Sequence, residues 1–382
     1  GDCSMRNSSG ALVLGHVAGP MVDRRYKHQN LHWCRALLQP SVLTGTLSAP
    51  RHLPHTFPHI RLFATNPSVI SDDVYLVRLT SYSYCSQHKN MPYLRKHAYE
   101  RNSLTAVLSK RQDAPLLSFT HSEDARALRV STTRMWILYN SWNGSSNLNS
   151  MMLRRYRWPS LELIAPPIAL RLAIARRREK NWSPFVVPPG ASRRGGATSR
   201  VRFTYQLEPH VVLACRPADG ECHVQHNTSA RALWAQRVPH SQRGGLRVTL
   251  SGGTPCVTLA GVPTCMAHFK AAEPASAVKQ AGPKRAGPYM HLWYAISPEP
   301  PFEVRSVSHP FRFAPLFNDA RDSVQFASGL AISADAARVT VSFGVGDCLA
   351  AELHVPSSEV LRMLRGDPDV SIMSSAGNAM AA

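Results

Sequence analysis

The stretch EKNWSPF, residues 179–185, stands ahead of a strand-like run at residues 202–207 and the tripeptide EPH at residues 208–210. It places a charged pair, an amide and a large aromatic side chain just before a turn and a β-run. Similar junctions, each a short polar motif followed by a strand, recur on both sides of it. This recurrence is the feature of the chain that predicts its fold.

The recurring polar motifs are spaced like structural repeats. They start at Asn66, Glu123, Lys180, Gly252 and Gln325, so successive starts lie 57, 57, 72 and 73 residues apart. A four-stranded antiparallel sheet with its loops fits such a length, and radial repetition of sheets removes long exposed edges. The spacing predicts an all-β protein, a five-bladed β-propeller. A large β-sandwich is the alternative that the pattern alone leaves open.

Local patterns assign individual segments. Residues 338–345 alternate apolar and polar side chains with a period of two, which is typical of a strand, and residues 74–79 and 135–140 are strand-like too. Residues 357–364 predict a short helix capped by a serine. Residues 85–115 are expected to be a loop insertion. Residues 161–178 predict a short helix or a pair of strands, because Pro166-Pro167 opposes one continuous helix.

Three regions follow from these assignments. Residues 1–60 are rich in Arg, His and Pro and carry no sustained period, so an irregular basic extension is expected. Residues 61–365 form the predicted propeller, and residues 366–382 a flexible tail.

The amino-acid composition of the chain indicates which classes of partner it could bind. The chain has 382 residues, 44% of them apolar, and 44 basic against 24 acidic side chains give a formal charge of +20. Such a balance suits a polyanion, an anionic substrate or a membrane surface. The apolar run at residues 161–175 is too short to cross a bilayer, so no membrane span is expected. The first residues lack the apolar core of a signal peptide.

Eight cysteines and four glycosylation triplets are also present. No C-x-x-C pair occurs, which favours mostly reduced, buried thiols over a disulfide framework. A zinc site is conceivable where two cysteines lie close to two histidines, but their spacing fits no standard ligand pattern, and no metal is expected; these residues are Cys215, Cys222, His223 and His226. The N-x-S/T triplets at Asn7, Asn143, Asn181 and Asn227 are interpreted as chance matches.

Taken in order, the motifs resemble those of a known family. The motifs are Asn66-Pro67-Ser68, Glu123-Asp124-Ala125-Arg126, residues 180–185, Gly252-Gly253-Thr254-Pro255 with Met266-Ala267-His268, and residues 326–329 with residues 342–347. The series resembles the five-bladed propellers of the β-mannoside phosphorylase family, glycoside hydrolase family 130, and especially their relatives attached to glycosyltransferases. The resemblance covers roughly residues 61–365.

The resemblance implies a sugar-binding site at the central mouth of the propeller. It implies that Asp124 is the proton donor, that Arg126 is the arginine of the acidic motif, and that Lys180, Asn181 and His268 contact substrate or phosphate. Inorganic phosphate is then a co-substrate, and no other cofactor is expected. The chain departs from the family where Ala125 replaces a proline. It departs again where Thr204-Tyr205 replaces a His-Arg pair, so part of the expected phosphate clamp is missing.

Each candidate has a structural alternative. Glycoside cleavage needs a proton donor and a nucleophile or activated water on the opposite face, but residues 123–126 also fit a salt bridge that closes a blade. His268 fits a core histidine as well as a ligand. Asp347 is a candidate substrate-binding residue at the mouth, but it also fits a turn cap. Trp182, Trp136 and Tyr139 are candidates for stacking on a sugar ring, with core packing expected for at least two of them.

Three functions remain open from sequence. The first is a carbohydrate-active propeller that acts on glycosidic bonds as a hydrolase, phosphorylase or glycosyltransferase-associated module, with a glycan or oligosaccharide as its partner. The second is a catalytically inactive glycan-binding propeller. The third is a basic protein that binds RNA or a large assembly through surface arginines. No nucleotide-binding glycine motif stands in a usable context.

Overall fold

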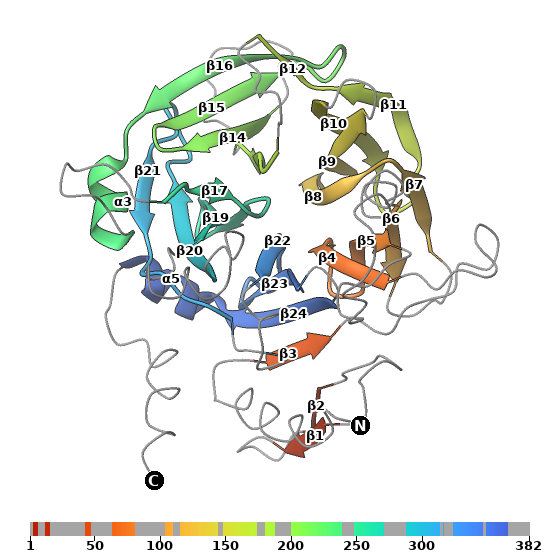
Figure 1. Ribbon diagram of the computed structural model, residues 1–382, viewed down its shortest axis with the longest axis vertical. Coiled ribbons are helices and arrows are strands. Elements are labelled where there is room, and N and C mark those ends of the chain that lie inside the picture. The colour runs from red at the N-terminus through yellow and green to blue at the C-terminus, as the bar shows by residue number, and fades with distance from the viewer. Residues whose placement is uncertain are drawn as a thin grey trace, which may run out of the picture.

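The computed structural model is a ring of five β-sheets arranged around a central axis (Figure 1). It describes residues 3–6, 12–15, 43–46, 63–80, 104–109, 115–143, 148–173, 180–187, 200–238, 248–270, 288–313, 316, 324–346 and 349–365. The prediction of an all-β, five-bladed propeller is therefore confirmed, and the β-sandwich alternative is wrong.

The five sheets, here called blades 1 to 5, follow one another along the chain. Blade 1 holds β4 (Phe63–Val69), β5 (Val74–Thr80), β6 (Leu104–Ser109) and β7 (Leu117–Thr120). Blade 2 holds β8 (Glu123–Ser131), β9 (Arg134–Asn143), β10 (Leu148–Arg157) and β11 (Leu163–Ala169). Blade 3 holds β13 (Ser183–Val186), β14 (Val201–Leu207), β15 (His210–Cys215), β16 (Glu221–Thr228) and the short parallel strand β12 (Arg171–Leu172).

Blades 4 and 5 complete the ring. Blade 4 holds β17 (Ser251–Gly252), β18 (Val257–Leu259), β19 (Val262–Lys270), β20 (Tyr289–Ile296) and β21 (Val304–Val307). Blade 5 holds β22 (Gln325–Ile332), β23 (Arg338–Val345), β24 (Leu349–Pro356) and β3 (Leu43–Thr46). A separate hairpin pairs β1 (Cys3–Arg6) with β2 (Leu12–Gly15). The helices among the described residues are α3 (Arg231–Arg237) and α5 (Ser357–Arg365).

The apolar core is divided into layers between neighbouring blades. On β5, Tyr75, Val77 and Leu79 pack toward β24 of blade 5, whereas Leu76 packs toward blade 2. Successive side chains of a strand point to opposite faces, so a central strand of a blade must be apolar on both faces. Helix α3 packs into the layer between blades 3 and 4, and α5 into the layer between blades 4 and 5.

The last blade takes strands from both ends of the chain. β3 pairs antiparallel with β24, with Leu43 opposite His354 and Thr46 opposite Ala351. Its residues lie within the segment 1–60, for which no strand was expected. The outer strand of blade 5 therefore comes from before the predicted boundary at residue 60, and that boundary stays a prediction.

Two other segments differ from their expected structure. β6 lies inside residues 85–115, where a loop was expected, and all six of its residues are buried. Residues 163–172 form strands β11 and β12, which selects the strand pair over the helix. The helix expected at residues 357–364 is confirmed as α5. Among the described residues, no helix is long and apolar enough to span a membrane.

The cysteines are the clearest correction. Cys215 bonds Cys222 across β15 and β16, and Cys256 bonds Cys265 in blade 4. The expectation of reduced thiols is wrong for these four residues, because two antiparallel hairpins bring cysteines that are seven and nine residues apart next to each other. The Cys215–Cys222 bond leaves neither cysteine of the zinc site considered from the sequence free to bind a metal. Within the described ranges, no group of three metal-binding side chains was found.

Candidate functional site

The innermost strands of the five blades carry the polar motifs to the centre of the ring. One of β4, β8, β13, β17 or β22 lies at an edge of each sheet, and Figure 1 shows β4, β8, β17 and β22 facing the axis. Each blade places at least one fully buried polar side chain at or next to its innermost strand, and these include Ser68, Arg126, Ser183, Thr254 and Ser328. The motif spacing seen in the sequence thus becomes a ring of polar groups around the axis.

Hydrogen bonds connect these inner strands from blade to blade. The Ser68 Oγ accepts from the Ala127 amide of blade 2 at 3.0 Å. The Ser328 Oγ of blade 5 donates to the Pro67 carbonyl of blade 1 at 2.6 Å. Buried polar groups need such partners, because an unpaired one costs free energy. The ring of inner strands is therefore held by polar contacts as well as by the apolar layers outside it.

In three blades, a polar residue beside the axis has a positive φ angle, which is the left-handed backbone conformation. Asn66, Asp124 and Asn181 have φ angles of 45°, 48° and 64°. The pairing register shifts at the first two of these positions, which is the signature of a β-bulge. Asn and Asp tolerate this conformation better than other residues with a side chain. The bulges re-aim these side chains and bring Asn66 Nδ2 to 2.9 Å from Asp124 Oδ1, to which it donates.

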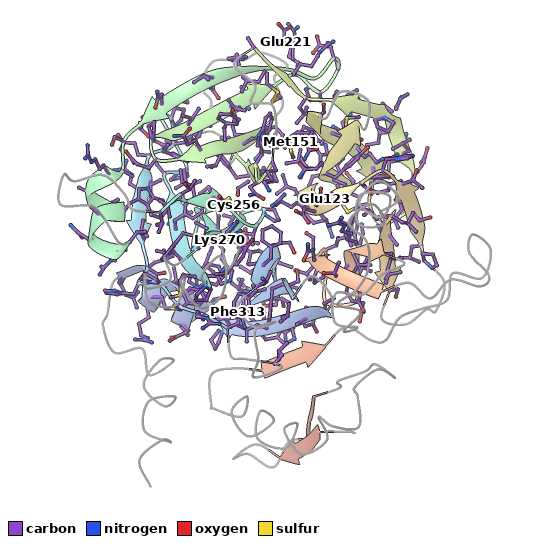
Figure 2. All side chains as sticks on the ribbon, viewed as in Figure 1. Glu123, Met151, Glu221, Cys256, Lys270 and Phe313 are labelled. Carbon is purple, nitrogen blue, oxygen red and sulfur yellow. A yellow bond between two sulfur atoms is a disulfide. The ribbon has the colours of Figure 1, made fainter. Side chains whose placement is uncertain are left out.

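The acidic pair of blade 2 faces an arginine of blade 1. Arg78 Nη1 lies 3.1 Å from Glu123 Oε1 and 3.9 Å from Asp124 Oδ1. Figure 2 shows Glu123 at the inner edge of blade 2. The salt-bridge alternative for residues 123–126 therefore has a structural basis in Glu123. Asp124 also takes part in this contact, and its side chain keeps 16% of its surface exposed.

Arg126 joins three blades at the centre. Its Nε donates to the Gly253 carbonyl at 2.7 Å, its Nη1 to the Asp124 carbonyl at 3.1 Å and its Nη2 to Asn181 Oδ1 at 3.0 Å. The guanidinium also lies 5.7 Å from the centre of the Phe326 ring. Burial lowers the pKa of Arg126 to about 10, and the charge of Asp124 opposes this shift. Arg126 therefore remains a cation at neutral pH, enclosed by protein acceptors.

His268 lies on β19 in an aromatic setting. Its ring stacks on Tyr289 at 5.2 Å and meets the Phe326 edge at 5.3 Å. Burial lowers the pKa of His268 well below its usual value, and the nearby charges of Arg126, Lys270 and Lys180 lower it further. The imidazole is therefore neutral at pH 7. Its buried Nδ1 lacks a hydrogen-bond partner among the described residues.

Two exposed lysines complete the charge around His268. Lys180 precedes Asn181 in blade 3, and Lys270 ends β19 with its Nζ 5.2 Å from the centre of the Tyr289 ring. We call the central set of residues the hub cluster. It comprises Asn66, Arg78, Glu123, Asp124, Arg126, Lys180, Asn181, Gly253, His268, Lys270, Tyr289 and Phe326. Four cations face two carboxylates in this cluster, so it has a net positive charge.

The structure brings several of the residues predicted from sequence into contact, but it does not describe all of them. Hydrogen bonds link Arg126 to the Asp124 backbone and to the Asn181 side chain, and Phe326 contacts both Arg126 and His268. Lys180 acts on His268 electrostatically. Asp347 lies outside the described residues. The functional roles of all these residues stay predictions.

The aromatic candidates are core residues. Trp182 is only 1% exposed and meets Phe203 and Tyr205 edge-on in the layer between blades 2 and 3. Trp136 and Tyr139 are buried as well. Core packing, the structural alternative for these side chains, therefore describes their surroundings, and none of them offers an open face to a sugar ring.

Several members of the hub cluster were not singled out from sequence. Arg78, Lys270, Tyr289 and Phe326 come from four different strands, and no local motif distinguishes the first three. Phe326 and Asn66 did lie in quoted motifs. The signal available in the sequence was their place at the start of those motifs. The motif start is therefore a better guide to the site than residue type alone.

Comparisons with known proteins bear on the fold. No protein-family model matches the chain, and no curated protein matches it. A glycosyl hydrolase from Bacteroides ovatus is similar in structure, with a TM-score of 0.50 and 11% identity over 77% of this chain and 84% of that one.

Two phosphorylases also match at lower similarity. A β-1,2-mannobiose phosphorylase from Listeria innocua has a TM-score of 0.46 and 12% identity, over 80% of this chain and 93% of that one. A mannose phosphorylase from Leishmania mexicana has a TM-score of 0.43 and 13% identity, over 77% and 84%. At the level of the fold, the likeness to the Bacteroides ovatus glycosyl hydrolase agrees with the resemblance drawn from the five motifs.

Proposed function

We propose that this protein is a carbohydrate-active propeller that acts on glycosidic bonds, with Asp124 as its proton donor. The observation that carries the proposal is the setting of Asp124. It stands on a bulge beside the propeller axis, is partly exposed, and is oriented by a neighbouring amide. The shared fold with a glycosyl hydrolase supports the proposal only by analogy, because one fold hosts many functions.

The first part of the proposal is the proton transfer. Asp124 donates its carboxyl proton to the glycosidic oxygen while the bond from that oxygen to the anomeric carbon breaks. Asn66 Nδ2 donates to Asp124 Oδ1 and so limits rotation of the carboxyl group. A rigidly oriented acid can contribute about 10²–10⁴-fold in rate.

The acceptor at the anomeric carbon is the second part of the proposal. Hydrolysis by inversion needs a second carboxylate about 6.5–9.5 Å from the acid to activate water. Within the described hub cluster, the other carboxylate is Glu123, which Arg78 already engages at 3.1 Å. The net positive charge of the cluster favours an anionic acceptor instead. Inorganic phosphate is therefore the proposed co-substrate, with Lys180 and Lys270 as its exposed candidate contacts.

The test is turnover of aryl mannosides and β-linked manno-oligosaccharides with and without phosphate. Asp124→Asn keeps the shape of the side chain but cannot donate the proton, so we expect kcat to fall by about 10²-fold or more. Glu221→Gln is the matched control, since Glu221 is an exposed carboxylate at the outer rim (Figure 2). Equal turnover by wild type and Asp124→Asn would remove Asp124 from its role. Phosphate dependence separates phosphorolysis from hydrolysis.

Glycan binding without turnover is the second candidate. The observation that favours it is Arg126, whose guanidinium is already bonded to three protein acceptors and is fully buried. An arginine held in this way braces blades rather than contacting a substrate. Calorimetric binding of an oligosaccharide that is recovered intact would support this candidate. Steeply salt-dependent RNA binding in the absence of sugar binding would oppose both.

A further inference from the structure

We infer that Asn227 is an acceptor site for an N-linked glycan, added while the chain passes through an oxidising compartment. The inference goes beyond the proposed function, because Asn227 lies on the rim of the ring and takes no part in the hub cluster. It depends on two independent observations, which are the disulfides of blades 3 and 4 and the position of the Asn227 triplet in the fold.

The disulfides indicate the redox environment. All four cysteines whose side chains the structure describes are bonded, as Cys215–Cys222 and Cys256–Cys265. Disulfides form and persist in oxidising compartments and are rare where thioredoxin and glutathione keep thiols reduced. One of these compartments, the lumen of the endoplasmic reticulum, is where N-x-S/T triplets of secreted proteins are N-glycosylated. The disulfides therefore favour interpreting the triplets as glycosylation sites, whereas the sequence alone favoured chance matches.

The geometry favours Asn227 over Asn181, the other triplet asparagine whose side chain the structure describes. It lies near the end of β16 with its side chain exposed, and Ser229, the hydroxyl residue of its triplet, is exposed as well. β15 pairs with β16 on one side. On the other side, the described part of the chain pairs β16 only at Glu221 and Cys222, through β12. A glycan at Asn227 would project from this outer edge into solvent.

Asn181 is the internal comparison. Its side chain accepts a hydrogen bond from Arg126 at 3.0 Å, and its backbone stands at a positive φ beside the axis. A β-carbon on Gly252 would lie only 2.4 Å from its carbonyl oxygen, so the backbone around it is tightly enclosed. A branched glycan on Asn181 is incompatible with this packing. The two triplets are alike in sequence, and the fold separates them.

The modification is a balanced group transfer. The amide nitrogen Nδ2 of Asn227 attacks the anomeric carbon of an oligosaccharide carried on a lipid diphosphate. A nitrogen–carbon bond forms, the bond from that carbon to the phosphate oxygen breaks, the lipid diphosphate leaves, and the amide releases one proton. No oxidant or reductant takes part.

A glycan here would also protect the sheet edge. An unpaired edge strand is a template for pairing with another chain, and proteins cover or charge such edges. β16 exposes Val224, one of the few large apolar side chains on the described surface. A polar, bulky group three residues away would keep other strands from this edge.

The experiment maps glycans on the full chain. The chain is produced behind a secretion leader in a eukaryotic host. The secreted and intracellular fractions are both treated with a glycan-releasing amidase that converts the acceptor Asn to Asp, and the peptides are analysed by mass spectrometry. We expect conversion at Asn227, no conversion at Asn181, and both disulfides intact before reduction.

Three variants separate this site from Asn7 and Asn143. Asn227→Gln and Ser229→Ala are expected to lose the mass of one glycan. Ser229→Thr is the matched control and is expected to keep it, because threonine also completes the triplet and can replace the Ser229 hydrogen bond to Glu208. An unmodified Asn227 in the wild-type chain, a glycan at Asn181, or free thiols at the four bonded cysteines would overturn the inference.

Discussion

Arg126 occupies an inner-strand position that the other four blades give to a hydroxyl residue. Ser68 and Ser328 each bond a backbone group of one neighbouring blade, whereas the guanidinium reaches acceptors in blades 2, 3 and 4. Burying a cation costs free energy unless it is paired and hydrogen-bonded. Its three acceptors and the nearby Asp124 charge supply that pairing, so one residue breaks the symmetry of the ring where the candidate site lies.

Buried histidines are the second residue-scale feature. Burial lowers the pKa of His291 to about 3 and that of His210 to about 4. His291 is fully buried and stacks on Phe313 at 4.5 Å. His291 also lies directly opposite His268 in the β19–β20 ladder, and its charge would further disfavour protonation of His268. The layer between blades 4 and 5 therefore keeps the imidazoles of His291 and His268 neutral.

This arrangement predicts loss of stability in acid. Between pH 6.5 and 3, His291 is protonated in the unfolded chain but neutral in the folded one. Unfolding is then favoured as pH falls, by about 1.4 kcal/mol per pH unit for each such histidine. We expect His291→Phe to flatten the pH dependence of the unfolding free energy by one proton over this window. Urea unfolding at a series of pH values measures it.

Exposed His223→Gln is the control for that experiment, and it should leave the slope as in wild type. An unchanged slope in His291→Phe would mean that the folded protein accepts the proton at this position. The buried, neutral state assigned to His291 would then be wrong.

At the scale of the element, the entrance to blade 4 depends on Gly252. A β-carbon on Gly252 would lie 2.4 Å from the Asn181 carbonyl oxygen and 2.5 Å from Ser183 Oγ. β17 therefore approaches the inner strand of blade 3 at backbone distance. The contact is continued by the Cys256 amide, which donates to the Pro184 carbonyl at 2.9 Å. Close approach of this kind is the role that glycine alone can fill.

Gly252→Ala should therefore lower stability by about 1–3 kcal/mol, the usual cost of overpacking a tight site. It should also displace Asn181 and weaken any ligand binding at the hub cluster. Gly261→Asn is the matched control, because Gly261 lies at a φ of 80° with open space around it, and Asn tolerates this conformation. Denaturant unfolding of both variants makes the comparison. Equal stability of the two would contradict the close contact.

Strands were predicted best where the side chains on one face are apolar and those on the other face are polar. The alternation of residues 338–345 appears as β23, with Val339, Val341 and Phe343 in one apolar layer. β6 was missed because a short strand buried on both faces has no period to detect. Helix α3 was missed as well, since seven residues are too few for a helical pattern and its one buried side chain is Trp234.

The whole molecule is closed by pairing segments from opposite ends of the chain. β24 would be an open edge without β3, which lies some 300 residues earlier in sequence. In a propeller, each blade packs on its neighbours, so an incomplete blade weakens two interfaces at once. Closure of this kind links the stability of the ring to residues outside the predicted propeller boundary.

Deleting residues 1–46 should therefore lower the unfolding free energy by about 2 kcal/mol or more, the size of a substantial point mutation. It should also promote self-association through the exposed edge of β24. Deleting residues 1–15, which removes only the β1–β2 hairpin, is the control and should have a smaller effect. Chemical unfolding and light scattering distinguish the two. Identical behaviour of both deletions would mean that β3 does not stabilise the ring.

The sequence by itself determined the number of blades, their order and the motif at each inner strand, because these follow from periodicity and spacing along the chain. It also pointed to Asp124, Arg126, Asn181 and His268 as candidates. Only the tertiary structure decided that Trp182 belongs to the core, that four cysteines are bonded, and that β3 completes blade 5. The packing of Trp182 and the pairing of β3 depend on contacts between segments remote in sequence, and no local pattern encodes which strands will face one another. The disulfides depend on the register of two hairpins, which the cysteine spacing alone does not reveal.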